Sequence, residues 1–208
     1  MINKKELSDF ISFVKKKESQ SPSIADIGFE PIEGFFKSEY NIKQLVIWRN
    51  ENRKFYRDTS ITDKPKTIKW FKSLLKDDYR IIFILNNRKL NSIPFGMLGI
   101  SSFDFNNSSC FLESIIRFNK DGPRDGMYMA INILCEWVFK NTKVKKIKVN
   151  CFLDIVNAVS LYHRCQFKPL DLIPLIGKRK IQGVHWVEAN KGTKAKRYYL
   201  VMERINNA

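Results

Sequence analysis

The chain has 208 residues, of which 44% are hydrophobic and 13% aromatic, enough for one buried core but too few for two large domains. With only 9 glycines and 7 prolines, it is neither a disordered nor a collagen-like chain. No apolar run approaches the roughly 20 residues of a membrane-spanning helix, and the N-terminal sequence MINKKELSDF lacks the apolar stretch of a signal peptide. We therefore expect a cytoplasmic protein that does not bind membranes.

The net charge is the first indication of a partner. The chain has 37 Lys and Arg against 21 Asp and Glu, a formal charge of +16, which favours an anionic ligand. The basic residues are spread along the chain, with short runs only at 15–17, 143–148 and 178–180, whereas nucleic-acid binders concentrate them in arms or stripes. A small polyphosphate explains the charge equally well, and a Lys-rich surface that only maintains solubility is the alternative.

The four cysteines do not form a metal-binding pattern. They show no C-x-x-C spacing, and the two histidines show no H-x-x-x-H spacing, so we expect no zinc or other metal site. Three of the four cysteines lie in apolar surroundings, where a free thiol behaves as a small buried hydrophobe.

The N-terminal segment has a helical pattern. Apolar residues at i, i+3, i+4 and i+7 predict an amphipathic helix over residues 4–17, which ends in residues 19–23 with their proline. Its apolar positions are Leu7, Phe10, Ile11 and Val14. We take residues 1–25 as an N-terminal helix and linker that packs on the main domain, 26–208, or on a partner.

Changes of hydrophobic period predict the remaining elements. In chain order they are a strand over 27–32, a helix from Ser38 through Trp48, a helix from about Pro65 to Leu75, strands over 79–85, 95–103 and 111–118, a helix through 127–138, a strand over 145–153, a helix over 156–165 and a last strand over 197–204. Helices that fall between runs of strands predict an α/β fold of the α+β type, with a central mixed sheet covered on both faces.

The turn after the third of the three consecutive strands is the first candidate site. Gly122 and Pro123 lead to the start of the long helix, where unpaired N–H groups and a partial positive charge suit a phosphate. Gly122 and Gly126 let a ligand approach the backbone closely, and Arg124 adds a charge-assisted contact. An ordinary strand-to-helix turn is the alternative.

Together, the strand, glycine turn, long helix, strand and short helix ending in LY-x-x-C-x-F resemble the GNAT superfamily of acyl-CoA dependent N-acetyltransferases. The resemblance spans residues 27–204 and implies a GNAT-like fold with acetyl-CoA as co-substrate. In the family's phosphate loop, the positions that align with Pro123, Gly126 and Tyr128 are Gln or Arg, Gly, and Gly or Ala, so only the central glycine is retained here.

The resemblance also implies the cofactor contacts. The backbone of 124–128 would cradle the diphosphate, and backbone donors of 116–118 would face the acyl carbonyl. A family asparagine corresponds to Ile155, so that Asn157 would replace it only in a shifted register. The expected cofactor-binding residues are Ile116, Arg117, Phe118, Arg124, Asp125, Gly126, Met127, Tyr128 and Asn157.

Three residues are candidates for proton transfer. Tyr162 matches the family tyrosine that protonates the departing thiolate, and a core aromatic is its alternative. A protonated amine must lose a proton before it attacks a thioester, and Glu113 or His185 would accept it. Glu113 could instead pair with Arg117 on the same strand. Cys165 and His163 point apart on a helix, so we expect direct transfer without a covalent intermediate.

The front half of the chain resembles two groups of acceptor sites. Trp48, Arg49, Asn50 and Trp70 are similar to residues in GNAT enzymes that acetylate nucleotide-linked amino sugars, including the pseudaminic acid type, and ribosomal-protein N-terminal acetyltransferases share this front half. Arg57 could hold a nucleotide phosphate or be solvated.

The implied function is acetyl transfer to a primary amine of a small molecule, foremost a nucleotide-linked amino sugar. The alternatives are a protein or peptide N-terminus, an inactive CoA-binding module and, third, a nucleic-acid binder. The oligomeric state is open, a homodimer included.

Overall fold

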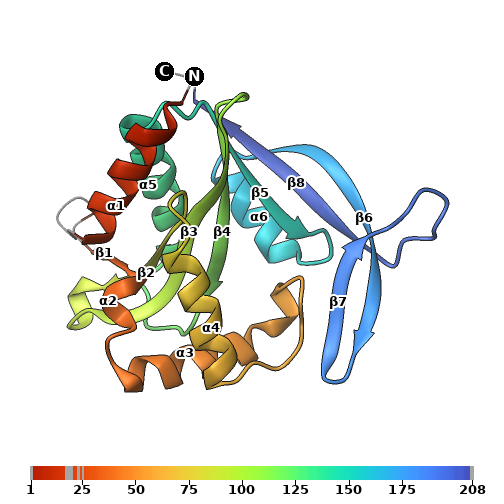
Figure 1. Ribbon diagram of the computed structural model, residues 1–208, viewed down its shortest axis with the longest axis horizontal. Helices are drawn as coiled ribbons and strands as arrows, with labels where there is room; N and C mark the ends of the chain where they lie inside the picture. The colour runs from red at the N-terminus through yellow and green to blue at the C-terminus, as the bar shows by residue number, and fades with distance from the viewer. Residues whose placement is uncertain (1, 17–20, 23, 25, 207–208) are drawn as a thin grey trace.

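The computed structural model describes residues 2–16, 21–22, 24 and 26–206. Its strands form one eight-stranded sheet in the order β1-β2-β3-β4-β5-β8-β6-β7, with helices on both faces (Figure 1). Neighbouring strands are antiparallel except for β4 and β5, which are parallel. The predicted mixed sheet is therefore confirmed.

The bounds of the elements are as follows. The helices are α1 Lys4–Lys16, α2 Ile32–Phe35, α3 Glu39–Glu51, α4 Lys64–Leu75, α5 Gly126–Asn141 and α6 Val156–Arg164, with 3-10 turns η2 Arg53–Phe55 and η3 Arg88–Leu90. The strands are β1 Ile27–Pro31, β2 Ile81–Asn87, β3 Ile93–Asp104, β4 Ser109–Arg117, β5 Lys146–Phe152, β6 Lys168–Lys180, β7 Gly183–Glu188 and β8 Arg197–Ile205.

Local signals placed most of these elements. The Ser38 side chain accepts a hydrogen bond from the Asn41 N–H at the start of α3, as its N-cap assignment predicts. α4 begins after Asp63, with Pro65 in its first turn, where a proline loses no hydrogen bond. The predicted end of α1, residues 17–20 and 23, lies outside the described residues.

The hairpin of β6 and β7 was not predicted. After the helix over 156–165 we expected an insertion that contains His185 and then the last strand, 197–204. The first half of β6 is mostly exposed and pairs with β8 as far as Leu175, whereas its second half, Leu175–Lys180, pairs with β7.

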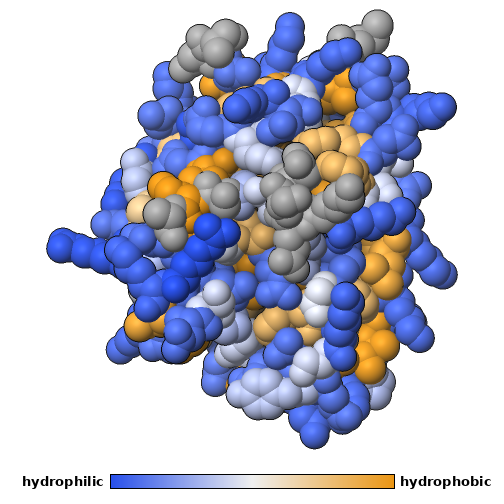
Figure 2. All heavy atoms as spheres, turned by 90° about the vertical axis from the view of Figure 1, so that its left-hand side faces the viewer, coloured by the Kyte–Doolittle hydropathy of each residue, from blue (hydrophilic) through white to orange (hydrophobic). Residues whose placement is uncertain are grey.

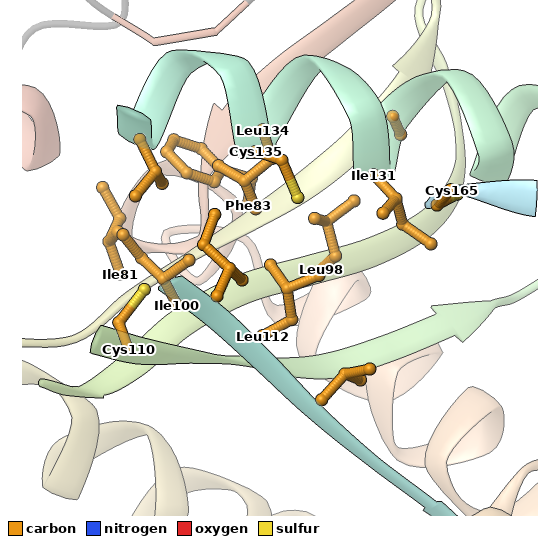
Figure 3. Close-up of a cluster of buried hydrophobic side chains, with 14 of the residues drawn as sticks. Ile81, Phe83, Leu98, Ile100, Cys110, Leu112, Ile131, Leu134, Cys135 and Cys165 are labelled. Atoms are coloured by element: carbon orange, nitrogen blue, oxygen red, sulfur yellow. The ribbon is translucent and has the colours of Figure 1, made fainter. Parts of the chain in front are cut away.

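Two apolar clusters cover the two faces of the sheet. On one face, Ile131, Leu134 and Cys135 of α5 point onto side chains of the strands, among them Leu98 and Leu112 (Figure 3). On the other face, residues of α2, α3 and α4 pack on β2, β3 and the end of β4. All four cysteines are buried and free, and in the described part of the chain no group of His, Cys, Asp or Glu gathers to hold a metal ion.

Helix α1 belongs to the first of these clusters. Leu7, Ile11 and Val14 are buried, and the rings of Phe10 and Trp137 lie 5.2 Å apart, so the helix packs on the main domain. The face on the side of α1 is mainly hydrophilic, with separate small apolar areas (Figure 2). Among the helices described, none is long and apolar enough to cross a membrane.

The sheet opens between its two parallel strands. β4 pairs with β5 only over Ser109–Leu112. Beyond that point β4 continues along β3, and β5 continues along β8 as far as Phe152. The register of β4 shifts around Ser114, whose φ is 54°, and such a bulge bends a strand. The two strands therefore separate and leave an opening inside the sheet.

Candidate active site

A cleft of about 1120 Å³ lies at this opening. Four elements form one half of its lining: β4 beyond its last pair with β5, the first turn of α5, the end of β5 and one side of α6. The segment from the end of α3 through η2 to α4 forms the other half. Large concave sites that join several elements are where ligands usually bind.

The N-terminus of α5 offers backbone donors to the cleft. The Gly126 N–H bonds to the Pro123 carbonyl at 2.9 Å, and Asp125 precedes the helix with φ 57° and no side-chain cap. In the described residues, no backbone acceptor is found for the N–H groups of Met127 and Tyr128. Free N–H groups at a helix start bind anions such as phosphate.

Several contacts fix the loop in front of α5. The Arg117 guanidinium donates to the carbonyls of Asn119 and Lys120 at 2.9 and 3.2 Å, and the Asn87 amide donates to the Asp121 carbonyl at 2.6 Å. The Arg117 side chain therefore holds the loop. The loop sets the helix N-terminus in place before any ligand binds.

The basic side chain beside the start of α5 is Arg164 and not Arg124, which was expected there. Arg124 is exposed and does not line the cleft. Arg164, at the end of α6, lines it and donates to the Asp125 carboxylate at 2.9 Å, with its guanidinium 4.8 Å from the Tyr128 ring. This pair neutralises an acidic group beside the helix start. Sequence reasoning missed Arg164, since its partner lies on a different element.

Tyr162 lines the cleft from α6, as does Asn157 in the first turn of that helix. Tyr162 is buried, and its ring packs edge-on against Phe167. Burial, together with the neighbouring Cys151 and Cys165, raises the pKa of the Tyr162 phenol. The phenol therefore stays protonated near neutral pH.

Glu113 is held by an arginine that the sequence did not suggest. The Arg80 Nε and Nη2 bond to the two carboxylate oxygens of Glu113, the second at 2.7 Å. The alternative pair with Arg117 does not form, because Arg80 binds both oxygens of Glu113 and the Arg117 guanidinium donates to two loop carbonyls. Burial raises the pKa of Glu113, and Arg80 partly offsets the rise.

The acceptor half of the cleft contains only some of the residues expected there. Arg49, Arg57 and Trp70 line it, as does Tyr56, which was not predicted. The Arg49 guanidinium lies 4.4 Å from the centre of the Trp70 ring. Arg57 donates to the Trp186 carbonyl at 2.9 Å and pairs with Glu188 at 3.3 Å. Arg57 therefore attaches its loop to β7.

Trp48, Asn50 and Phe118 lie away from the lining. Trp48 stacks on Phe118 with ring centres 4.0 Å apart and belongs to the second apolar cluster. The Phe118 N–H bonds to the Phe95 carbonyl at 2.7 Å, so this N–H does not face the cleft as a donor for a ligand. The Asn50 side chain accepts from the Thr62 N–H and donates to the Thr62 carbonyl, which ties the loop between α3 and α4.

His185 does not come together with Tyr162 and Glu113. It lies on β7, outside the lining of the cleft, with its Nδ1 3.6 Å from the Asp58 carboxylate. Burial raises the pKa of Asp58, but hydrogen bonds from Lys180 and Ser60 outweigh it and lower the pKa to about 2. Of the two candidate bases, only Glu113 faces the cleft.

Comparisons with known proteins give structural neighbours only. No family model and no curated protein matches the chain. A probable acetyltransferase of the GNAT family from Chromobacterium violaceum superposes with a TM-score of 0.66 at 9% identity, over 88% of this chain and 85% of that one. Spermidine N-acetyltransferase from Vibrio cholerae, in complex with CoA and spermine, gives 0.65 at 13%, over 88% and 96%.

The microcin C7 self-immunity acetyltransferase MccE, in complex with acetyl-CoA and AMP, gives a TM-score of 0.64 at 12% identity, over 88% of this chain and 94% of that one. Identities this low establish a common fold and leave chemistry to be argued from the site. The eight-stranded mixed sheet with helices on both faces therefore matches the fold of GNAT acetyltransferases.

Proposed function

We propose that the protein is an N-acetyltransferase that moves the acetyl group of acetyl-CoA to a primary amine. The observation that carries the proposal is the convergence of three features on one cleft: the gap between β4 and β5, the open N-terminus of α5 and the protonated Tyr162. Backbone amides beside a helix start suit a diphosphate, and the gap leads from there toward Tyr162. Solved neighbours of the same fold hold acetyl-CoA or CoA.

The residues that line the cleft fit acetyl-CoA as the bound co-substrate. The N–H groups of Met127 and Tyr128 would bind the diphosphate, with Arg164 close by. Successive N–H groups of a strand point to opposite edges, and the Phe118 N–H points to β3. The Arg117 N–H therefore faces the gap and would bond to the chain that carries the thioester.

Acetyl-CoA would supply the activated acyl group, and the protein would handle the protons. The amine nitrogen bonds to the acyl carbon, the carbon–sulfur bond breaks, and one proton leaves the nitrogen. Tyr162 would give its phenol proton to the departing thiolate, and Glu113 would accept the amine proton directly or through water. Positioning of the amine against the thioester supplies much of the acceleration in reactions of this type.

For the acceptor we propose a nucleotide-linked amino sugar. The support is the excess of arginines along the cleft, namely Arg49, Arg57, Arg80, Arg117 and Arg164 against the acidic Glu113 and Asp125. The structure of MccE, which has the same fold, is a complex with acetyl-CoA and AMP. A peptide N-terminus is the second candidate, because a cleft of about 1120 Å³ would also admit the end of an extended chain.

Binding and turnover test the proposal separately. Acetyl-CoA should raise the melting temperature, and Ala158→Trp, which fills the cleft from α6, should abolish the rise. The matched control is Val156→Trp, because Val156 is on the same helix, 71% exposed and outside the lining. CoA release is then followed with UDP-linked amino sugars and with short peptides. Binding without turnover of any amine would leave a CoA-binding module, and no binding at all would refute the proposal.

A further inference from the structure

We propose that Arg49 and Tyr56 form a subsite that binds an oxyanion of the acceptor, a phosphate or a carboxylate. The inference rests on the proposed acetyl transfer and defines the chemical class of amine that the cleft takes. It starts from two polar atoms in the acceptor half of the cleft, the Arg49 Nη1 and the Tyr56 hydroxyl oxygen. Both atoms are buried, and within the described residues neither has a hydrogen-bond partner outside this pair.

Arg49 is a cation without a counter-ion. It lies in the last turn of α3, with its guanidinium against the rings of Trp70 and Tyr56, at 4.4 and 5.9 Å. No carboxylate in the described chain lies within ion-pair distance of it. Burial lowers the pKa of Arg49, but guanidinium remains charged at physiological pH. A buried cation costs free energy until a partner neutralises it.

Tyr56 supplies a second donor beside the first. It follows η2, next to Arg49, and lines the same cleft. Burial raises the pKa of Tyr56 to about 12, and the positive charge of Arg49 opposes the rise. The phenol is therefore neutral and able to donate. A planar guanidinium beside a hydroxyl matches the two or more acceptor oxygens of a phosphate or carboxylate.

The other charged residues that line the cleft do not neutralise Arg49. Its acidic residues are committed elsewhere, Glu113 to Arg80 and Asp125 to Arg164. The acceptor half therefore keeps the uncompensated charge of Arg49. An anionic acceptor gains from this charge, whereas a polyamine is repelled by it. The protein should thus reject spermidine, although a spermidine N-acetyltransferase shares its fold.

Direct binding provides the first test. UDP and succinate, as probes for phosphate and carboxylate, are titrated into the full chain by calorimetry. Arg49→Gln should weaken the probe that binds by about tenfold or more, the usual effect of losing a charged hydrogen bond. Tyr56→Phe should weaken it less. Arg53→Gln is the matched control, because Arg53 is exposed on the adjoining η2 and outside the lining; it should bind as the unmodified protein does.

The stronger of the two probes identifies the source of the oxyanion. Binding of neither probe, or equal binding to the protein and to Arg49→Gln, overturns the inference. Kinetics provide the second test: Arg49→Gln should raise the KM of a UDP-linked amino sugar or of a peptide with a free carboxylate by about tenfold or more, and leave the KM of acetyl-CoA unchanged. Faster turnover of spermidine than of these anionic amines also overturns it.

The two tests separate this inference from the proposed function. If no amine releases CoA, the proposed transfer fails, while the calorimetric comparison of the protein with Arg49→Gln still decides the role of Arg49. If CoA is released and Arg49→Gln changes neither binding nor KM, the transfer stands and the oxyanion subsite fails.

Discussion

Replacement of Arg80 by methionine tests how the cleft holds Glu113. The two side chains are 23% and 20% exposed and joined by two hydrogen bonds, so the change leaves a largely buried carboxylate without its partner. Breaking a buried ion pair by removing one partner costs about 3–5 kcal/mol of folding free energy. Because these two side chains are partly exposed, we expect a loss of about 2–3 kcal/mol. For a domain of this size the melting temperature should fall by about 4–12 °C.

The loss should depend on pH in a defined direction. Burial raises the pKa of Glu113 above its ordinary value, and Arg80 opposes the rise, so the pKa rises further in Arg80→Met. A carboxyl group whose pKa is raised by folding favours the folded state at low pH, and this contribution is lost as the pH rises through the folded-state pKa. The variant should therefore lose most stability at about pH 8 and recover part of it near pH 5, as measured by urea unfolding.

Two further variants decide the cause. The double variant Arg80→Met with Glu113→Gln has no buried charge and should regain most of the lost stability. Arg124→Met removes an exposed arginine and should change stability by less than about 0.5 kcal/mol. An equal loss at both pH values, or no recovery in the double variant, would show that Arg80 acts through packing and does not hold Glu113 as an anion.

Three other predictions follow from the same contacts. Tyr162→Phe should lower kcat by about 100-fold and leave the KM of acetyl-CoA unchanged; an unchanged kcat in steady-state kinetics would remove the phenol from the reaction. Gly122→Ala should cost about 1–3 kcal/mol in urea unfolding, because its Cβ would lie 2.5 Å from the Phe95 ring; Gly28→Ala should cost less, because the nearest atom to its Cβ, at 3.2 Å, belongs to the movable Arg88 side chain. The four buried cysteines should react with a thiol reagent only after unfolding, since burial raises the pKa of each thiol; rapid reaction of the native protein would contradict their burial.

Periodicity predicted the elements at the α5 end of the cleft well, because each of them depends on a local pattern. The glycine turn and α5 are contiguous in the chain, and Tyr162 lies on a short helix whose bounds the pattern gave to within a residue. The opening of the sheet was not predictable in the same way. It depends on a bulge at Ser114, and a serine with positive φ has no distinctive pattern in the sequence.

The positions of the expected acceptor residues on their helix could have shown that only some of them face the cleft. Trp48, Arg49 and Asn50 are consecutive on a helix, where each residue turns by about 100° from the last. They cannot all face one cleft. In the structure only Arg49 does, while Trp48 stacks in the apolar cluster and Asn50 ties the loop to Thr62.

The rest of the acceptor wall depends on contacts between distant parts of the chain. The Thr59 N–H bonds to the Val184 carbonyl at 2.9 Å, and the Trp186 N–H bonds to the Arg57 carbonyl at 2.8 Å, so a loop before α4 pairs with a strand near the C-terminus. Neither segment alone predicts the other. A change in β7 can therefore move Arg57, and through it the wall that includes Tyr56, without touching the α5 end of the cleft. Under the proposed function, acceptor preference can thus change without a change at the α5 end, because the two halves are built from separate sets of contacts.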